Sequence, residues 1–280
     1  MTRIIINADD LGINQEVDKA IENAIEKGVV SSASILANGN AYDDAIRIAK
    51  KYPQVSFGVH LNLIEFKPLV SEKTFAKYGI IDNKGSFIEG AIFVMDYYNE
   101  EFLNAVRDEL DAQINKIYMS GVHISHIDSH QHTHTIPQLK EIIVGLMLKY
   151  NLKKIRRVQV PSIRLMLNAK KNEVVHLDKS NAVMPKKRNV IIRRFNLIKV
   201  IFITKKWNRF FSRRFVTTDS FFAYRTLYFN HQIVKSDVTN KTVELMCHPG
   251  HPAFEKETTL VLESAISGVI DYQLITYNDL

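Results

Sequence analysis

The stretch RIIINADDLG, residues 3–12, decides the fold that we expect for this chain. Its first half, RIIIN, is a short run of β-branched residues, which predicts a buried strand. Its second half changes at once to polar residues, with Asp9 and Asp10 side by side before Gly12. A strand that runs directly into carboxylates is typical of an enzyme whose site lies at the carboxyl ends of its strands.

Other apolar runs of the chain end in the same way. HLNL follows VSFGV, DSHQHTH follows HISHI, and CHPGH follows VELM, with helical patterns between them. In a parallel barrel all these strand ends meet on one face, whereas an open sheet gathers only those near its switch point. We therefore expect an α/β fold, a distorted (β/α) TIM-like barrel of seven parallel strands. The predicted strands are 3–7, 29–38, 54–63, 121–128, 155–162, 242–250 and 272–277.

By length and composition one large α/β domain is as likely as two smaller ones, and with the barrel pattern we expect a single domain over residues 1–280. The chain has 46% apolar and 24% charged residues, enough for one sizeable core. Its one cysteine, Cys247, cannot form an internal disulfide, and the apolar run before Asp9 is too short for a signal-peptide core. The longest uncharged run, from Gly28 to Tyr42, is rich in Ser and Asn, so no membrane span is predicted. These features favour a cytoplasmic protein.

The net charge of +7 comes from one variable segment, residues 179–218, which holds 12 Lys or Arg and no Asp or Glu. The rest of the chain has 25 basic and 30 acidic residues, so the charge does not predict nucleic-acid binding for the whole protein. Three interpretations stay open for this segment. It forms a solvated basic face over the barrel, it contacts an anionic membrane, or it binds phosphate on an activated or lipid-linked sugar. The membrane interpretation concerns residues 185–214, where one predicted helical face carries Ile191, Phe195, Ile198 and Phe202.

The stretch HISHIDSHQHTH, residues 123–134, holds five of the ten histidines. A lone histidine on an apolar strand is commonly a core residue, but a cluster is typical of a divalent metal site. With one carboxylate of the Asp9–Asp10 pair and His60, it offers a three-ligand set that leaves a position for water. An isolated Asp pair would equally cap the next helix. His248 is placed to protonate a leaving group, and the alternative is a solvated turn histidine.

Five motifs, in this order, resemble the YdjC-like carbohydrate deacetylases, a group that includes chitooligosaccharide deacetylases: NADDLG, FGVHLNL, HIDSHQHTH, TTDSFF and ELMCHPGH. The resemblance runs from Arg3 to about Leu280. It implies a distorted (β/α) barrel related to polysaccharide deacetylases. It also implies metal-dependent removal of acetyl groups from N-acetylated sugars, of the N-acetylglucosamine type, by attack of a metal-bound water.

The resemblance also implies roles for single residues. Asp10, His60 and His130 would bind one divalent metal, Asp9 would be the base, and His248 the acid. Two imidazoles and one carboxylate suit Zn²⁺ by ligand type, whereas the resemblance leaves Mg²⁺ open. The neighbouring polar residues are predicted to orient the ligands or to contact substrate, with Asp128 favoured as an orienting group. They are Asp128, His126, His132 and His134.

Two rival functions remain at this point. The same donors would serve a metal-dependent phosphoesterase, although a two-metal site calls for more carboxylates than these motifs contain. A barrel that only binds a glycan or a membrane is the non-enzymatic rival, and it would not need a base, three ligands and an acid together. The oligomeric state is open, a homodimer included.

Overall fold

The computed structural model describes residues 1–95, 98–159, 190–225, 238–268 and 270–280, with the side chains of 190–200 and 265 left out of account. The strands are β1 (Thr2–Leu11), β2 (Ser32–Ile35), β3 (Ser56–Leu61), β4 (Ile124–Ser129), β5 (Ser220–Ala223), β6 (Thr242–Cys247) and β7 (Tyr272–Leu274). The α-helices are α1 (Gln15–Glu26), α2 (Tyr42–Lys51), α3 (Glu72–Lys77), α4 (Glu100–Met119), α5 (Lys140–Lys149), α7 (Val190–Ser212) and α10 (Glu255–Leu262). Short 3₁₀ turns are η1 (Ala91–Val94), η2 (His130–Thr135), η3 (Pro137–Leu139), η4 (Pro252–Phe254), η5 (Ala265–Gly268) and η6 (Tyr277–Asp279).

The seven strands form one parallel sheet in the order β4-β3-β2-β1-β6-β5, with β7 also paired to β1. The central strand is β1, which is almost wholly buried along its length. Burial on both faces explains its unbroken run of isoleucines, because a strand inside a parallel α/β sheet has no solvent face. The sheet curls into a distorted barrel, and the predicted α/β barrel of seven strands is confirmed.

The two edge strands, β4 and β5, are joined by backbone that is not itself a strand. The Ile127 amide donates to the Lys154 carbonyl, and the Arg156 amide donates back to the Ile127 carbonyl. On its other side the same segment pairs with Val216, just before β5, through the bridge between Lys154 and Val216. Residues 153–156 therefore close the curl and direct the Arg156 side chain toward the charged groups of β1, β4 and β6.

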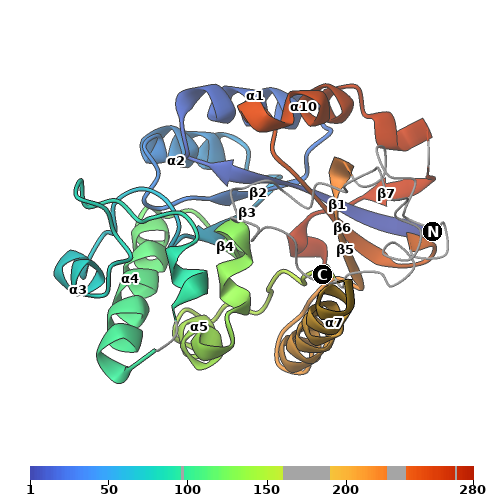
Figure 1. Cartoon of the computed structure of the whole chain (residues 1–280). Coiled ribbons are helices and arrows are strands. Elements are labelled where there is room, and N and C mark those ends of the chain that lie inside the picture. The colour runs from blue at the N-terminus through green and yellow to red at the C-terminus, as the bar shows by residue number, and fades with distance from the viewer. Residues whose placement is uncertain (96–97, 160–189, 226–237, 269) are drawn as a thin grey trace.

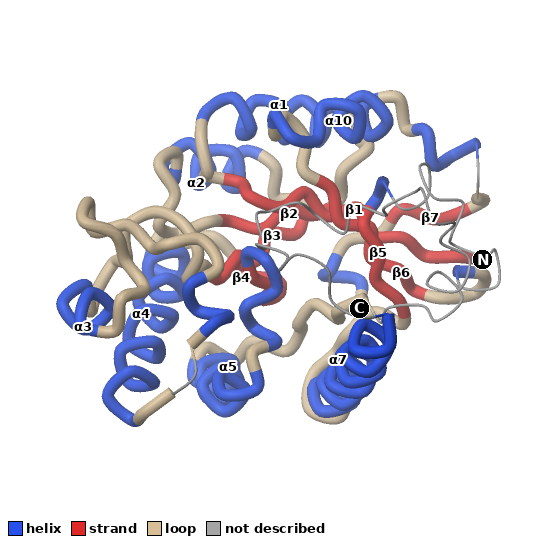
Figure 2. Tube along the Cα trace, viewed as in Figure 1, coloured by secondary structure: helices blue, strands red, loops and turns tan. Residues whose placement is uncertain are grey.

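The helices lie outside the curved sheet (Figures 1 and 2). In this view α1, α2 and α10 are above the strands, while α4, α5 and α7 are below them. Asparagine side chains start two of these helices: Asn14 accepts from the Val17 amide, and Asn99 accepts from the Phe102 amide. The helices leave the carboxyl ends of the strands to the loops that carry the polar motifs.

One predicted strand is wrong in part, although the predicted number is right. The described part of 155–162 contributes only an isolated bridge at Ile155, and residues 160–162 lie outside the described chain. The seventh strand is instead Ser220–Ala223, which begins in the TTDSFF motif and ends one residue after it. This strand is four residues long and follows a basic segment, so its own sequence pattern was too short to predict it.

Helix α7 occupies much of the basic segment and lies at the lower right of the view, below β5 (Figure 1). Its Trp207 and Phe211 are buried against the core, whereas Phe202 is 68% exposed and Ile203 is 47% exposed. Three of the four residues of the predicted apolar face, Ile191, Phe195 and Ile198, lie outside the residues whose side chains the structure describes. Within the described ranges, α7 and every other helix is too short or too polar to cross a bilayer.

Candidate active site

A break in the sheet register places the two aspartates of NADDLG. The pairing of β1 with β2 shifts between Ala8 and Leu11, so Asp9 and Asp10 lie in an irregular part of the strand. Asp10 itself adopts a left-handed backbone conformation, with φ 68°, and Gly12 follows with φ 98°. A non-glycine residue in this conformation costs on the order of 1 kcal/mol or more, which is typical of functional sites. The turn lets the two neighbouring carboxylates point to different partners.

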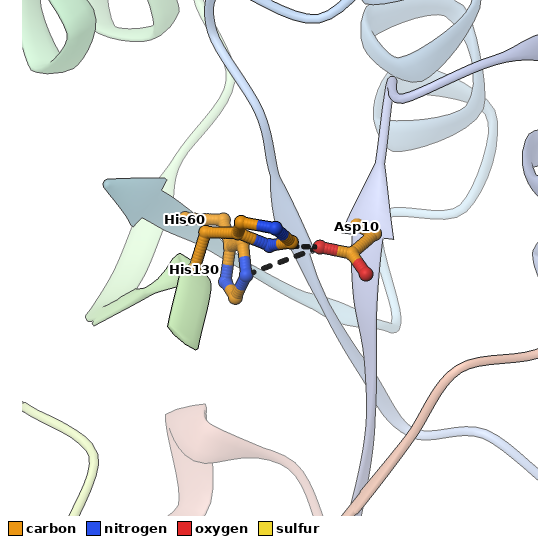
Figure 3. Close-up of side chains that lie close together, drawn as sticks. All are labelled: Asp10, His60 and His130. Carbon is orange, nitrogen blue, oxygen red and sulfur yellow. Dashed lines mark hydrogen bonds and ion pairs between the residues drawn. The ribbon is translucent and has the colours of Figure 1, made fainter. Parts of the chain in front are cut away.

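Asp10 faces two histidines (Figure 3). Its Oδ1 lies 2.8 Å from His130 Nδ1 and 3.3 Å from His60 Nε2. Potential ligand atoms of the three residues all lie within 4.8 Å of one another. His60 comes from β3 and His130 from the first residue of η2 after β4, so three strand ends supply one donor each. This donor set fits a divalent metal, because two imidazoles and a carboxylate leave further positions for water or substrate.

The charges of the three groups are strongly coupled. Burial raises the pKa of Asp10, but His130 and His60 outweigh it and hold this pKa well below its usual value. Burial lowers the pKa of both histidines, whereas the carboxylates around them raise it to about 10 for His60 and about 9 for His130. A metal that binds these nitrogens must therefore displace protons.

Asp128 orients His60 from behind. Its Oδ1 lies 2.8 Å from His60 Nδ1, and the two residues are register partners on β3 and β4. Its other oxygen accepts from Ser34 Oγ at 2.7 Å. A histidine whose Nδ1 is held by a carboxylate presents Nε2 to a metal in a fixed direction. The geometry thus brings Asp128 to the position expected of an orienting group.

Asp9 has a different environment from its neighbour. Arg156 donates to it twice, from Nη1 to Oδ2 and from Nη2 to Oδ1, both at 2.6 Å. Asn7 Nδ2 adds a bond to Oδ1 at 2.8 Å. An ionised carboxylate has about four acceptor positions, so among the described groups one position on Oδ2 stays free for a proton.

Arg156 lies at the centre of a buried cluster of charged residues. Besides Asp9, it contacts Asp128 Oδ2 at 2.8 Å from Nη2 and Glu244 Oε1 at 2.7 Å from Nε. Asp9, His60 and Asp128 also lie close enough together to suggest a metal site. However, the guanidinium is bonded to both of those carboxylates. Arg156 therefore already supplies a positive charge to the group formed by Asp9, His60 and Asp128.

His248 stands at the carboxyl end of β6 beside Glu257, the third residue of α10. The backbone N–H of His248 donates to Glu257 Oε1 at 2.7 Å, and the ring Nδ1 lies 3.3 Å from the same oxygen. Burial lowers the pKa of His248, but Glu257 and, to a smaller degree, Asp10 and Asp9 raise it above its usual value. The neighbouring carboxylates thus favour the protonated imidazole, with Glu257 as the largest contributor.

The other predicted histidines lie around the site in the packed interior. His126 is fully buried and stacks on Tyr277 with ring centroids 3.7 Å apart, and burial lowers its pKa to about 3. His134 pairs through Nδ1 with Ser129 Oγ. His132, half-buried, packs its ring edge against Phe221 of β5. Burial lowers the pKa of His132 to about 4 and that of His134 to about 3, so all three rings are neutral at pH 7.

The sequence reasoning missed Arg156 and Glu257. Both are charged residues that are almost completely buried. The signal for Arg156 was an arginine inside the apolar pattern IRRVQV, and it was read only as part of a strand. Glu257 carries no sequence signal apart from its position nine residues after His248. Its role depends on how α10 folds back over the end of β6.

Comparison with known proteins identifies the family of this chain. The sequence model of a family described as "YdjC-like protein" matches residues 3–275 of the chain. The chain belongs to the YdjC-like family. The resemblance seen in the five motifs is thereby confirmed, since all five lie within the match: NADDLG, FGVHLNL, HIDSHQHTH, TTDSFF and ELMCHPGH.

Relatives that this chain resembles in sequence are named carbohydrate deacetylases. One from Vibrio cholerae is 34% identical over 152 residues, 54% of this chain and 57% of the relative. One from Thermoanaerobacter pseudethanolicus is 30% identical over 152 residues and is covered to 59% of its length. The match thus spans a little over half of each relative.

A crystal structure shows the same fold over the whole chain. It is that of an Enterococcus faecalis protein provisionally described as a cellobiose-phosphate cleavage protein. The two structures share a TM-score of 0.68 at 21% identity, over 99% of this chain and 98% of the other. At this identity the likeness concerns the fold alone.

Proposed function

We propose that this protein is a divalent-metal-dependent deacetylase of N-acetylated sugars, of the N-acetylglucosamine type. The observation that carries the proposal is the division between two adjacent carboxylates. Asp10 points at His60 and His130, whereas Asp9 is clamped by Arg156 and keeps one free acceptor position. The relatives are named carbohydrate deacetylases, and this name supports deacetylation as the reaction. The assay described below measures the sugar chain length and the metal that the enzyme uses.

In this proposal Asp10, His60 and His130 hold the metal, which would polarise the acetyl carbonyl and activate a water molecule. Asp9 Oδ2 takes the proton of the water as its oxygen attacks the carbonyl carbon. The carbon–nitrogen bond then breaks, and protonated His248 gives its proton to the departing nitrogen. Acetate and the free amino sugar are the products. Glu257 raises the pKa of His248, which favours the charged imidazole needed for this step.

The one-metal deacetylase fits this site better than a two-metal phosphoesterase. A second ion would have to share Asp9, His60 and Asp128. The guanidinium of Arg156 is already bonded to both of these carboxylates, so a second cation there would face its charge at close range. A protein that only binds a glycan would not need a second carboxylate, Asp9, that stays outside the set of metal ligands and can accept a proton.

The test is acetate release from N-acetylated chito-oligosaccharides and lipid-linked N-acetyl sugars, with metal-stripped protein and Zn²⁺, Mg²⁺, Mn²⁺ or Co²⁺ restored. Asp9→Asn is expected to abolish release but to keep the metal, measured by elemental analysis, whereas Asp10→Asn is expected to lose both. Asp111→Asn, at an exposed ion pair with Lys149, is the matched control and should leave both unchanged. No release by the wild type with metal bound would contradict the proposal.

We also propose that the outer face of α7 contacts an anionic membrane surface. Exposed Phe202 and Ile203 stand beside Lys205, Lys206 and Arg209, and none of the described carboxylates forms an ion pair with these three cations. Apolar side chains among unpaired cations are typical of interfacial helices. Vesicles with anionic lipid should retain the protein at low salt, and vesicles of neutral lipid should not. Equal retention on both would refute the electrostatic contact.

A further inference from the structure

The network around Arg156 continues beyond the site to the end of the chain. Tyr277, in the last turn η6, is fully buried and donates its hydroxyl to Glu244 Oε2 at 2.5 Å. The other oxygen of Glu244 accepts from Arg156 Nε at 2.7 Å. A continuous path of charge-assisted hydrogen bonds thus runs from Tyr277 to Asp9. Glu244 itself is completely buried on β6 and does not touch Asp9, Asp10 or the histidines of the site.

We propose that Tyr277 and Glu244 are positioning residues that hold Arg156 against Asp9. The inference rests on the proposed role of Asp9 as the base. A guanidinium is planar, so fixing Nε on one edge fixes the direction of the two Nη groups on the other edge. Glu244 grips that Nε edge, while both Nη groups donate to Asp9. Tyr277 in turn holds the carboxylate of Glu244 from the far side.

Tyr277 is suited to this role because it is itself held on every side. Its ring stacks on His126, with ring planes 9° apart. Its amide donates to Ser56 Oγ at 3.0 Å, and its carbonyl accepts from Lys154 Nζ at 2.6 Å. Lys154 lies two residues before Arg156 in the segment that closes the curl. The last turn therefore contacts that segment through the Lys154 side chain and, through Glu244, holds the tip of its arginine.

Precise placement is what a general base requires, since a shift of about 1 Å can cost on the order of 100-fold in rate. A Tyr277 hydroxyl that only stabilised the fold would affect the amount of folded enzyme and leave the kcat of each folded molecule unchanged. A positioning hydroxyl would lower kcat and leave KM and metal affinity nearly unchanged. These two roles are therefore separable by measurement.

The experiment compares Tyr277→Phe, which keeps the stacked ring, with Tyr78→Phe as the matched control. Tyr78 also donates to a carboxylate, Glu101 at 2.9 Å, but between α3 and α4. We expect kcat for acetate release to fall about 10-fold or more in Tyr277→Phe, with KM and metal Kd within about twofold of wild type. Tyr78→Phe should match the wild type in all three.

A second variant, Glu244→Gln, closes a double-mutant cycle. If both residues act through Arg156, their effects should not add. The loss of kcat in the double variant should then be little larger than the loss in the less active single variant. In a crystal structure of Tyr277→Phe, at least one of the two Arg156–Asp9 bonds should lengthen from 2.6 Å to beyond hydrogen-bond distance. Both bonds retained in that structure, or kcat within twofold of wild type, would each overturn the inference.

The crystallographic measurement also separates this inference from the proposed function. An inactive wild type would count against deacetylation alone. The Arg156–Asp9 distances in Tyr277→Phe would still decide whether the last turn of the chain holds the arginine.

Discussion

Positive charge is used in opposite ways in two regions of this molecule. Inside the sheet, one fully buried cation, Arg156, is bonded to three carboxylates from three strands. On α7, the cations Lys205, Lys206 and Arg209 are exposed, and none of the described carboxylates pairs with them. The net charge of +7 comes from the basic segment 179–218, which includes α7, whereas the proposed chemistry depends on the first region. Total charge therefore says little about function here, because burial sets how strongly a charge interacts with its surroundings.

The largest effect should come from removing the buried cation. Arg156→Ala leaves Asp9, Asp128 and Glu244 as buried negative charges without their counter-ion. We expect a loss of about 3–5 kcal/mol in the free energy of unfolding, measured by urea denaturation. The control is Arg157→Ala next to it, a half-buried arginine whose guanidinium makes, among the described residues, a long contact of 3.5 Å with the Thr218 carbonyl. Equal losses for both arginines would erase the contrast between the fully buried, ion-paired cation and its neighbour.

The next effect concerns the metal. Asp128→Asn removes the carboxylate that holds His60 Nδ1 at 2.8 Å, so the imidazole loses its fixed direction and part of its basicity. We expect the affinity for Zn²⁺ to fall about 10–100-fold, measured by competition with a chelating dye. Ser86→Ala, on the surface of the long loop before α4, should bind as the wild type does. An unchanged Kd in Asp128→Asn would show that His60 does not depend on this partner.

A smaller effect should come from a buried carboxylate that has no cation bonded to it. Asp18 accepts the Gly12 amide at 2.6 Å, and burial raises its pKa to about 7. Because its pKa is near 4 in the unfolded chain, its contribution to stability is largest below pH 4 and is lost as the pH rises to 7. Asp18→Asn should gain about 1–2 kcal/mol in unfolding free energy at pH 8 and nothing at pH 4.

Thermal unfolding of wild type and Asp18→Asn across pH 4–8 checks this expectation. Asp82→Asn, at an exposed loop carboxylate, is the control for a general effect of removing one negative charge. A gain that does not depend on pH would mean that ionisation of Asp18 is not its cause.

The smallest effect on the folded protein is expected on α7. Lys206→Glu with Arg209→Glu changes exposed side chains, so the free energy of unfolding should stay within about 0.5 kcal/mol of wild type. Acetate release from a soluble oligosaccharide should also stay the same, whereas retention on anionic vesicles should fall. If the soluble activity fell with it, the basic face would belong to the site and the two regions would not be independent.

Several features of this protein are determined by local sequence. The run RIII followed by NADD, and the three similar boundaries, predicted parallel strands whose ends carry a metal-type donor set. This worked because apolar runs and the residues directly after them are local patterns, and a parallel fold brings strand ends to one face. The strand ends predicted a set of one carboxylate and two imidazoles, and the family resemblance named Asp10, His60 and His130 as that set. The structure places potential ligand atoms of these three residues within 4.8 Å of one another.

Other features depend on contacts between residues far apart in the chain. Asp9 and Asp10 look alike in NADDLG, and only the register shift in β1 and the approach of Arg156 give them different partners. The short strand Ser220–Ala223 exists because β6 offers it an edge, while the stronger pattern at 155–159 makes only bridges. Tyr277 reaches Glu244 because the last turn folds into the sheet. Such contacts depend on register, closure and burial, which no local pattern encodes, and only the tertiary structure decided them.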